Sequence, residues 1–124
     1  MEIRDHLTKL KNVTPIQACI KLTGYEIKKL LDTLLGWTAN NKKLHKTFEF
    51  GDFLTMFSFM FKISETAMTI NHHPNMTSTF TTVTIDADTW NLGHVISNKD
   101  EKLARKTKNI YQKEYDQTTY FHLQ

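Results

Sequence analysis

The sequence predicts an α+β fold in which antiparallel strands form a sheet and helices cover one of its faces. Apolar residues recur at helical spacing near residues 27–34 and 53–68, and they alternate with polar residues near 44–50 and 82–86. A third amphipathic stretch follows near 103–111. The order helix, strand, helix, strands, helix is typical of an α+β layer architecture. The uncovered face of the sheet then has to meet solvent or another subunit.

The chain is long enough for one domain with its own core. It has 124 residues, of which 40% are hydrophobic and 23% are charged, both ordinary values for a globular protein. A domain of this size needs no disulfide or metal in order to fold. We expect a single domain over residues 14–124, preceded by an N-terminal extension over residues 1–13 that shows no clear period.

The first well-marked helix begins after Thr23. Thr23 and Glu26 have the spacing of a capping box, in which each side chain accepts from a backbone N–H of the first turn. The apolar stripe that follows consists of Ile27, Leu30, Leu31 and Leu34. Gly36 is a suitable end, because glycine tolerates the left-handed closing conformation. An earlier helical start is also suggested at Thr14–Pro15.

The middle of the chain predicts a strand and then the central helix. Asn40–Asn41 is a turn signal, and the alternation from Leu44 to Phe50 favours a strand with one buried face. Asp52 is a suitable N-cap for the helix that follows. Its apolar residues at helical spacing are Phe53, Phe57, Met60, Phe61, Ala67 and Met68. We expect this phenylalanine and methionine stripe to pack in the core.

A hairpin and a last helix complete the pattern. Pro74 disfavours a helical conformation at the residue before it, so the helix should end near Asn71. Val83 and Ile85 share one face of a predicted strand, and a turn around Thr81 pairs that strand with residues 76–80. The segment 97–100 resembles a helix cap, and the helix after it carries Leu103, Thr107, Ile110 and Tyr111.

Charge, cysteine content and the lengths of the apolar runs argue against a nucleic-acid-binding, a secreted or a membrane-spanning protein. The net charge is only +3, and the basic run between Lys99 and Lys113 is interleaved with acidic residues, so we expect a solvated helix face and no nucleic-acid partner. Cys19 is the only cysteine, which indicates a reducing compartment. No apolar N-terminal run resembles a signal peptide, and the apolar stretch 53–63 is too short to span a membrane.

Two adjacent histidines, His72 and His73, are the most informative polar residues. They have an ordinary interpretation as loop residues or as satisfied groups at a helix end. A second interpretation is a metal site, because His72, His73 and His94 together could supply the three protein ligands that a catalytic zinc requires. However, the sequence has no HExxH helix and no paired cysteine motif. A third interpretation is proton transfer, because a pair of imidazoles can hold one ring protonated and the other neutral. A protonated ring beside a neutral one suits an elimination reaction, in which one atom of the substrate gains a proton while another loses one.

The run Asn71-His72-His73-Pro74 resembles the signature of the pterin-4a-carbinolamine dehydratase family. Further matching positions are Phe80, Trp90, Asp100, Gly36-Trp37 and the run from Lys46 to Phe53. The resemblance spans about residues 22–110. It implies a four-stranded antiparallel sheet with three helices packed on one face, assembled as a homodimer or homotetramer.

The resemblance also implies an activity. Members of the family dehydrate 4a-hydroxytetrahydrobiopterin to quinonoid dihydrobiopterin, a step that recycles the pterin used by aromatic amino acid hydroxylases, without a metal or organic cofactor. By the same resemblance, His72 is expected to be the principal acid/base, and His73 a partner that binds and orients the pterin. The positions expected to bind substrate are Asn71, Pro74, Asp88, Thr89, Trp90 and Asp100. Hydrogen bonding at the end of a strand is an equally good role for Asp88 and Thr89, and a helix start is one for Asp100.

The sequence departs from the family pattern at the proposed site. Trp90 stands where many members carry a third histidine, and Trp has an N–H donor but cannot shuttle a proton. Asn71 replaces a common Asp, and Met68 occupies a position that is often charged. The segment 90–100 is one residue longer than usual, and His94 lies in it.

Two other roles follow from the same resemblance. Animal relatives are dimerisation partners of a homeodomain transcription factor through the helix face used for self-association, so a non-enzymatic protein-binding role is the alternative to catalysis. Related domains are linked to molybdopterin handling, and the same pocket would suit either pterin. The expected location is the cytoplasm, with the nucleus as a second compartment, and no membrane association is expected.

Overall fold

The computed structural model describes residues 18–40 and 42–116. Its elements in chain order are α2 (Gly24–Thr33), β1 (Thr38–Asn40), β2 (Lys43–Glu49), α3 (Phe53–Ile70), β3 (Asn75–Thr79), β4 (Thr82–Ala87), a 3₁₀ turn at Trp90–Leu92 and α4 (Asn98–Glu114). The predicted extension, the helical start at Thr14–Pro15 and Asn41 of the predicted turn lie outside the described residues.

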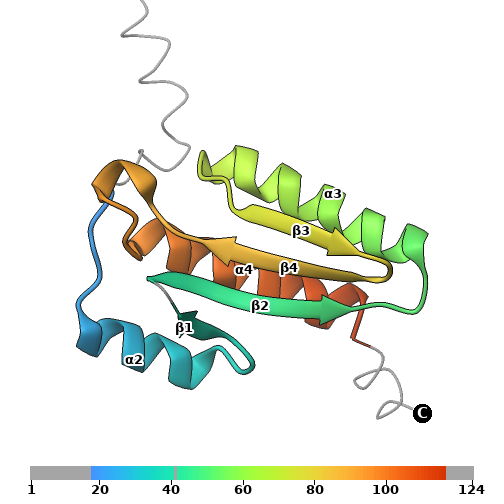
Figure 1. Cartoon of the computed structure of the whole chain (residues 1–124), viewed down its shortest axis with the longest axis horizontal. Helices are drawn as coiled ribbons and strands as arrows, with labels where there is room; N and C mark the ends of the chain where they lie inside the picture. Colours follow the sequence, from blue (N-terminus) through green and yellow to red (C-terminus); the bar gives the residue numbers. More distant parts are fainter. Residues whose placement is uncertain (1–17, 41, 117–124) are drawn as a thin grey trace, which may run out of the picture.

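The four strands form one antiparallel sheet in the order β1-β2-β4-β3. Figure 1 shows α3 and α4 lying across one face of this sheet, with α2 beside the β1 edge. The predicted α+β class, with three helices and a four-stranded antiparallel sheet, is therefore confirmed.

Alternation along β2 and β4 separates the two faces of the sheet. Leu44 and Phe48 on β2 are buried opposite Ala87 and Val83 on β4, as the alternation predicted. The residues of opposite parity, His45 and Thr47 on β2 and Thr84 and Asp86 on β4, are polar and not buried. Thr47 and Thr84 pair there through their hydroxyls at 2.8 Å. The helices thus complete a core on one side only.

The first helix begins as predicted but ends earlier. Thr23 and Glu26 form the capping box, and the helix stops at Thr33, three residues before Gly36. Gly36 has a φ of +85°, and a Cβ there would lie 2.7 Å from Lys46 Nζ. The glycine is therefore needed in the turn that leads to β1 rather than at the helix cap. The three-residue strand β1 was not predicted.

The prediction for the apolar stripe of α3 was right for Ala67 and Met60, which contribute to the core, and wrong for its other members. Asp52 caps the helix as expected, but the residues it buries are Met56, Phe59, Ile63 and Ala67. Four members of the predicted stripe are more than half exposed: Phe53, Phe57, Phe61 and Met68. The helix is apolar on more than one side, so helical spacing alone selects no unique inner face. Its second apolar face is left open to solvent.

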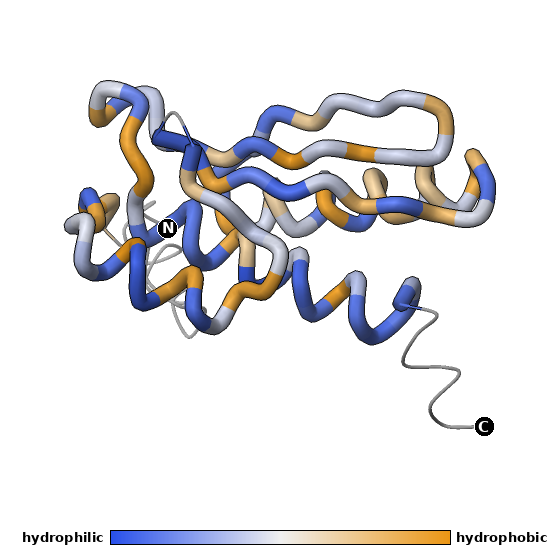
Figure 2. Tube along the Cα trace, turned by 60° about the horizontal axis from the view of Figure 1, so that its bottom comes forward, coloured by the Kyte–Doolittle hydropathy of each residue, from blue (hydrophilic) through white to orange (hydrophobic). Residues whose placement is uncertain are grey.

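The last helix is amphipathic, as predicted. Ser97 and Asp100 form a second capping box, and Leu103, Ala104 and Thr107 are buried. Figure 2 shows single hydrophobic residues recurring along an otherwise hydrophilic α4. None of the helices in the described ranges has the length and apolarity needed to cross a membrane.

Candidate functional site

The histidine pair lies where α3 turns into β3. Asn71 ends the helix in a left-handed conformation with φ 53°, and the His72 N–H donates to the Ala67 carbonyl at 2.9 Å. Pro74 then favours the extended backbone in which β3 begins at Asn75. The two imidazoles therefore leave the chain at a sharp corner between two packed elements, which fixes their backbone positions.

His72 is held by a buried carboxylate. Its Nε2 lies 2.5 Å from Asp100 Oδ1, and its side chain is only 11% exposed. Asp100 is fully buried at the start of α4. Because Nε2 is occupied by Asp100, the other ring nitrogen of His72, Nδ1, is the one available to a substrate. A carboxylate at this position compensates the positive charge that the imidazole carries when both of its nitrogens are protonated.

The carboxylate of Asp100 is positioned by two further hydrogen bonds. Its Oδ2 accepts from Thr89 Oγ1 and from the Ser97 backbone N–H, each at 2.8 Å. Thr89 Oγ1 also lies 2.6 Å from Ser97 Oγ, which accepts from Cys19 Sγ at 3.4 Å. One carboxylate therefore both caps α4 and fixes the ring of His72. The Ser97–Asp100 cap was visible in the sequence, but its connection to His72 was not.

A cavity of about 250 Å³ opens beside this network. It is lined by Cys19, Asn71, His72, His73, Asp88, Thr89, Trp90, Asn91 and Lys99. Its volume is slightly below the range of about 300–1,000 Å³ common for drug-sized ligands, which suits a small heterocycle.

The structure gathers most of the predicted site residues around the cavity. Asn71, His72, His73, Asp88, Thr89 and Trp90 line it. Pro74 and Asp100 do not: Pro74 shapes the backbone, and Asp100 lies behind His72. His73 is exposed and makes no side-chain hydrogen bond to any residue in the described ranges.

Three lining residues were not predicted: Cys19, Asn91 and Lys99. Lys99 belongs to the basic run that we expected to be solvated. Its position two residues after the cap residue Ser97, whose side chain accepts from the Lys99 N–H, is the signal that places it beside the cavity. Cys19 is brought there by the pairing of Lys21, two residues later, with Ser97, a contact between distant segments that no local pattern indicates.

Trp90 and His94 lie on the loop that follows Asp88. Trp90 belongs to the 3₁₀ turn and is mostly exposed at the edge of the cavity. His94 does not line the cavity; its Nδ1 lies 2.8 Å from Asp88 Oδ2. In the described part of the chain, no three His, Cys, Asp or Glu side chains are grouped as metal ligands.

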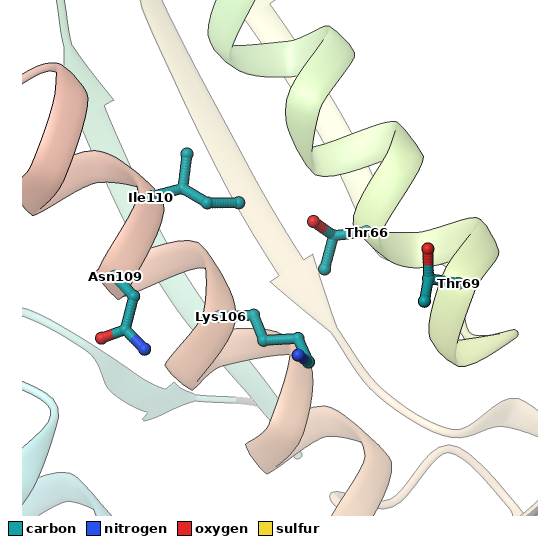
Figure 3. Close-up of a pocket in the computed structure, with 5 residues that line it drawn as sticks. All are labelled: Thr66, Thr69, Lys106, Asn109 and Ile110. Carbon is teal, nitrogen blue, oxygen red and sulfur yellow. The ribbon is translucent and has the colours of Figure 1, made fainter. Parts of the chain in front are cut away.

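A second cavity, of about 360 Å³, lies between α3 and α4 and is shown in Figure 3. Its lining residues are Thr66, Thr69, Lys106, Asn109 and Ile110. Lys106 is the one titratable side chain in this set, so the second cavity offers no acid–base pair. The cavity beside His72 is therefore the better candidate for catalysis.

Comparison with known proteins identifies the family. The family model described as pterin 4 alpha carbinolamine dehydratase matches residues 20–110, well over half of the chain. The chain belongs to the pterin-4a-carbinolamine dehydratase family. The matched segment includes every residue of the cavity except Cys19.

Relatives of the dehydratase family cover the same segment. Two that carry the name "putative pterin-4-alpha-carbinolamine dehydratase" come from Prochlorococcus marinus (strain MIT 9515) and Opitutus terrae. The first is 38% identical over 74% of this chain and 95% of its own length, and the second is 35% identical over 72% and 92%.

A solved structure of a family member has a similar fold. The crystal structure of a transcriptional coactivator/pterin dehydratase from Brucella melitensis is 30% identical to this chain. It matches with a TM-score of 0.68 over 73% of this chain and 97% of that protein. The predicted membership of the dehydratase family is thereby confirmed.

Proposed function

We propose that this chain dehydrates 4a-hydroxytetrahydropterins to quinonoid dihydropterins, with His72 as the principal acid. The observation that carries the proposal is the pairing of His72 with the buried Asp100 at the wall of a cavity that also exposes His73. Membership of the dehydratase family supports the same reaction.

The chemistry requires one proton to be delivered and another removed. In the substrate a hydroxyl and a ring nitrogen share carbon 4a, and hydroxide is a poor leaving group at neutral pH. A protonated His72, compensated by Asp100, gives its Nδ1 proton to the departing oxygen. The C–O bond breaks, water leaves, and the adjacent ring N–H loses its proton to a neutral base, either His73 or water. Acid–base catalysis of this kind typically contributes about 10²–10⁴ in rate.

The remaining cavity residues bind the pterin. Asp88 offers a carboxylate just after β4, and Asn71 offers an amide at the end of α3. Thr89 lines the cavity but is buried, and its hydroxyl is bonded to Asp100 and Ser97. Trp90 supplies a flat ring and an N–H donor where many relatives carry a histidine. Asp100 acts through His72 and is a positioning residue, and Pro74 sets the backbone of His73.

The test is the rate at which the purified chain dehydrates a 4a-hydroxytetrahydropterin. We expect His72→Ala to lower this rate by about 10²–10⁴ and His73→Ala to lower it too. A matched control is His45→Ala, because His45 also pairs with an aspartate, Asp86, at 2.6 Å but lies outside the cavity. The proposal fails if folded His72→Ala and His73→Ala variants both keep the wild-type rate.

The physiological role that we propose is recycling of the tetrahydrobiopterin used by aromatic amino acid hydroxylases. Handling of a molybdopterin is the alternative role for the same cavity. The unpaired Cys19 favours a reducing compartment, so we place the protein in the cytoplasm, with the nucleus as a second site.

A second candidate function is protein binding through α3. The outer face of this helix carries Phe53, Leu54, Phe57, Phe61 and Met68, each between 54% and 80% exposed. Contiguous apolar patches of this kind mark interaction surfaces. We propose that this face joins copies of the chain into a homodimer or homotetramer. The word coactivator in the name of the Brucella melitensis protein makes a different protein partner the alternative occupant.

A further inference from the structure

We infer that His94 is a positioning residue that fixes the carboxylate of Asp88 at the wall of the substrate cavity. The inference rests on the proposed dehydratase function and assigns a role to a histidine outside the cavity.

The geometry joins His94 to the site through one contact. His94 Nδ1 lies 2.8 Å from Asp88 Oδ2, and Asp88 lines the cavity. The Asp88 side chain is 19% exposed, whereas that of His94 is 70% exposed. Within residues 18–40 and 42–116 neither side chain makes another hydrogen bond or ion pair. His94 packs little, so its contribution has to act through Asp88.

The backbone of the loop is shaped to bring the two side chains together. Thr89 and Val95 pair across the base of the loop, with the Thr89 N–H donating to the Val95 carbonyl at 2.8 Å. Gly93 and His94 then take successive left-handed conformations, with φ of 89° and 57°. Few residue types other than glycine accept this conformation readily, mainly Asn, Asp and His. This turn reverses the direction of the chain and brings the side chain of His94 into contact with that of Asp88.

The contact matters for binding because of the chemistry of the ligand. The pyrimidine edge of a reduced pterin presents an amino group and a ring N–H, and an ionised carboxylate accepts from both. A carboxylate that rotates freely loses conformational entropy when it binds such an edge, and this loss lowers the affinity. A proton on His94 Nδ1 donates to Oδ2, fixes the plane of the carboxylate and leaves its remaining lone pairs for the substrate.

The position of His94 argues against a direct role in proton transfer. Its Nδ1 faces Asp88, and the ring lies outside the cavity wall. A positioning residue should therefore change how tightly the substrate binds and leave the chemical step intact. This separates it from His72, whose loss should lower kcat.

The test compares His94→Asn with His94→Asp in the full chain. The two substituents have the same shape, and both accept the left-handed backbone. The Asn amide nitrogen is bonded to Cγ, as Nδ1 is in histidine, so it can still donate to Asp88, whereas Asp can only accept and repels it. We expect His94→Asn to keep KM within about threefold and His94→Asp to raise KM by about 10-fold or more with kcat within about twofold.

Equilibrium binding of 7,8-dihydrobiopterin, measured by calorimetry, should follow the same pattern as KM. Combining His94→Asp with Asp88→Asn should cost no more affinity than Asp88→Asn alone, because the histidine acts only through that carboxylate. Equal KM and affinity in wild type, His94→Asn and His94→Asp would overturn the inference, as would a loss of kcat at unchanged KM.

A wild-type chain that binds dihydrobiopterin without turning over the substrate would instead refute the proposed function. If His94→Asp fails to fold, His94→Gly removes the donor without backbone strain and is expected to raise KM similarly.

Discussion

At the scale of single residues, Asp100 connects the stability of the fold to the candidate site. Its Oδ2 receives the cap hydrogen bond of α4, and its Oδ1 contacts His72 Nε2. Buried carboxylates are costly unless all their lone pairs are satisfied, and this one has three partners. Replacing it should therefore affect both folding and catalysis.

Asp100→Asn tests this double role. The amide keeps the shape of the carboxylate but loses its charge, so it compensates a protonated His72 less well. We expect the dehydration rate to fall by at least about 10-fold and stability to fall by about 1–2 kcal/mol, from the weakened cap and buried contacts. Chemical denaturation and initial rates measure the two effects. An Asp100→Asn variant with wild-type activity would show that the charge is not used in catalysis.

Asp52 provides the matched control and a pH prediction. It caps α3 by accepting from the Thr55 N–H at 2.7 Å, far from the histidines. This backbone hydrogen bond lowers the pKa of Asp52 below its usual value. A carboxyl with a lowered folded pKa stabilises the fold above its unfolded pKa, and that contribution is lost as pH falls through the folded pKa. The stability difference between wild type and Asp52→Asn should therefore shrink below about pH 4, with activity unchanged at neutral pH. A pH-independent difference would contradict this role.

At the scale of secondary structure, α3 has two apolar faces with different tasks. Phe59 is fully buried and contacts the rings of Phe48 and Tyr111. Phe57 lies on the outer face and is 54% exposed. The two phenylalanines are two positions apart, so they make a natural comparison.

Phe59→Ala should destabilise the domain by about 3–5 kcal/mol, because it opens a cavity in the aromatic core. Phe57→Ala should cost at most about 0.5 kcal/mol in dilute protein, where no partner covers that face. Denaturant titrations at low protein concentration measure both. Equal losses for the two variants would mean that the inner face of α3 has been assigned incorrectly.

Capping and turn residues predicted most of the helices and strands correctly. The features that the sequence did not predict depend on contacts between residues far apart in the chain. The capping residues Thr23, Asp52 and Ser97 and the hairpin turn at Thr81 act within a few residues, so the sequence displays them directly. The strand β1 has only three residues and exists through its pairing with β2. The contact between His72 and Asp100 joins residues 28 positions apart, so the family pattern could name both residues but not their pairing.

At the scale of the whole molecule, the elements between residues 18 and 116 that the structure describes leave two surfaces uncovered among themselves: the polar face of the sheet and the apolar face of α3. Polar side chains such as Thr47 and Thr84 satisfy one another on the sheet. On α3 the rings of Phe53 and Phe57 contact each other, with centroids 5.5 Å apart, yet both remain more than half exposed. We therefore expect association through α3 rather than through the open sheet face.

Light scattering after size exclusion tests this expectation. The wild-type chain should elute as a dimer or tetramer, and Phe57→Glu or Phe61→Glu should shift it to a smaller species, because each places a charge within the apolar face. Leu35→Glu is the control, since Leu35 is 79% exposed but lies outside α3. A monomeric wild-type protein across the concentration range would contradict the proposed homo-oligomer.

In the proposed reaction His72, held by Asp100, presents its Nδ1 to carbon 4a of a bound pterin. A crystal structure of the chain with 7,8-dihydrobiopterin measures this directly. We expect the ring system in the cavity between His72 and Trp90, with His72 Nδ1 within about 4 Å of carbon 4a, and the contact with Asp100 intact. A pterin bound between α3 and α4, or one with its carbon 4a turned away from His72, would rule out His72 as the acid.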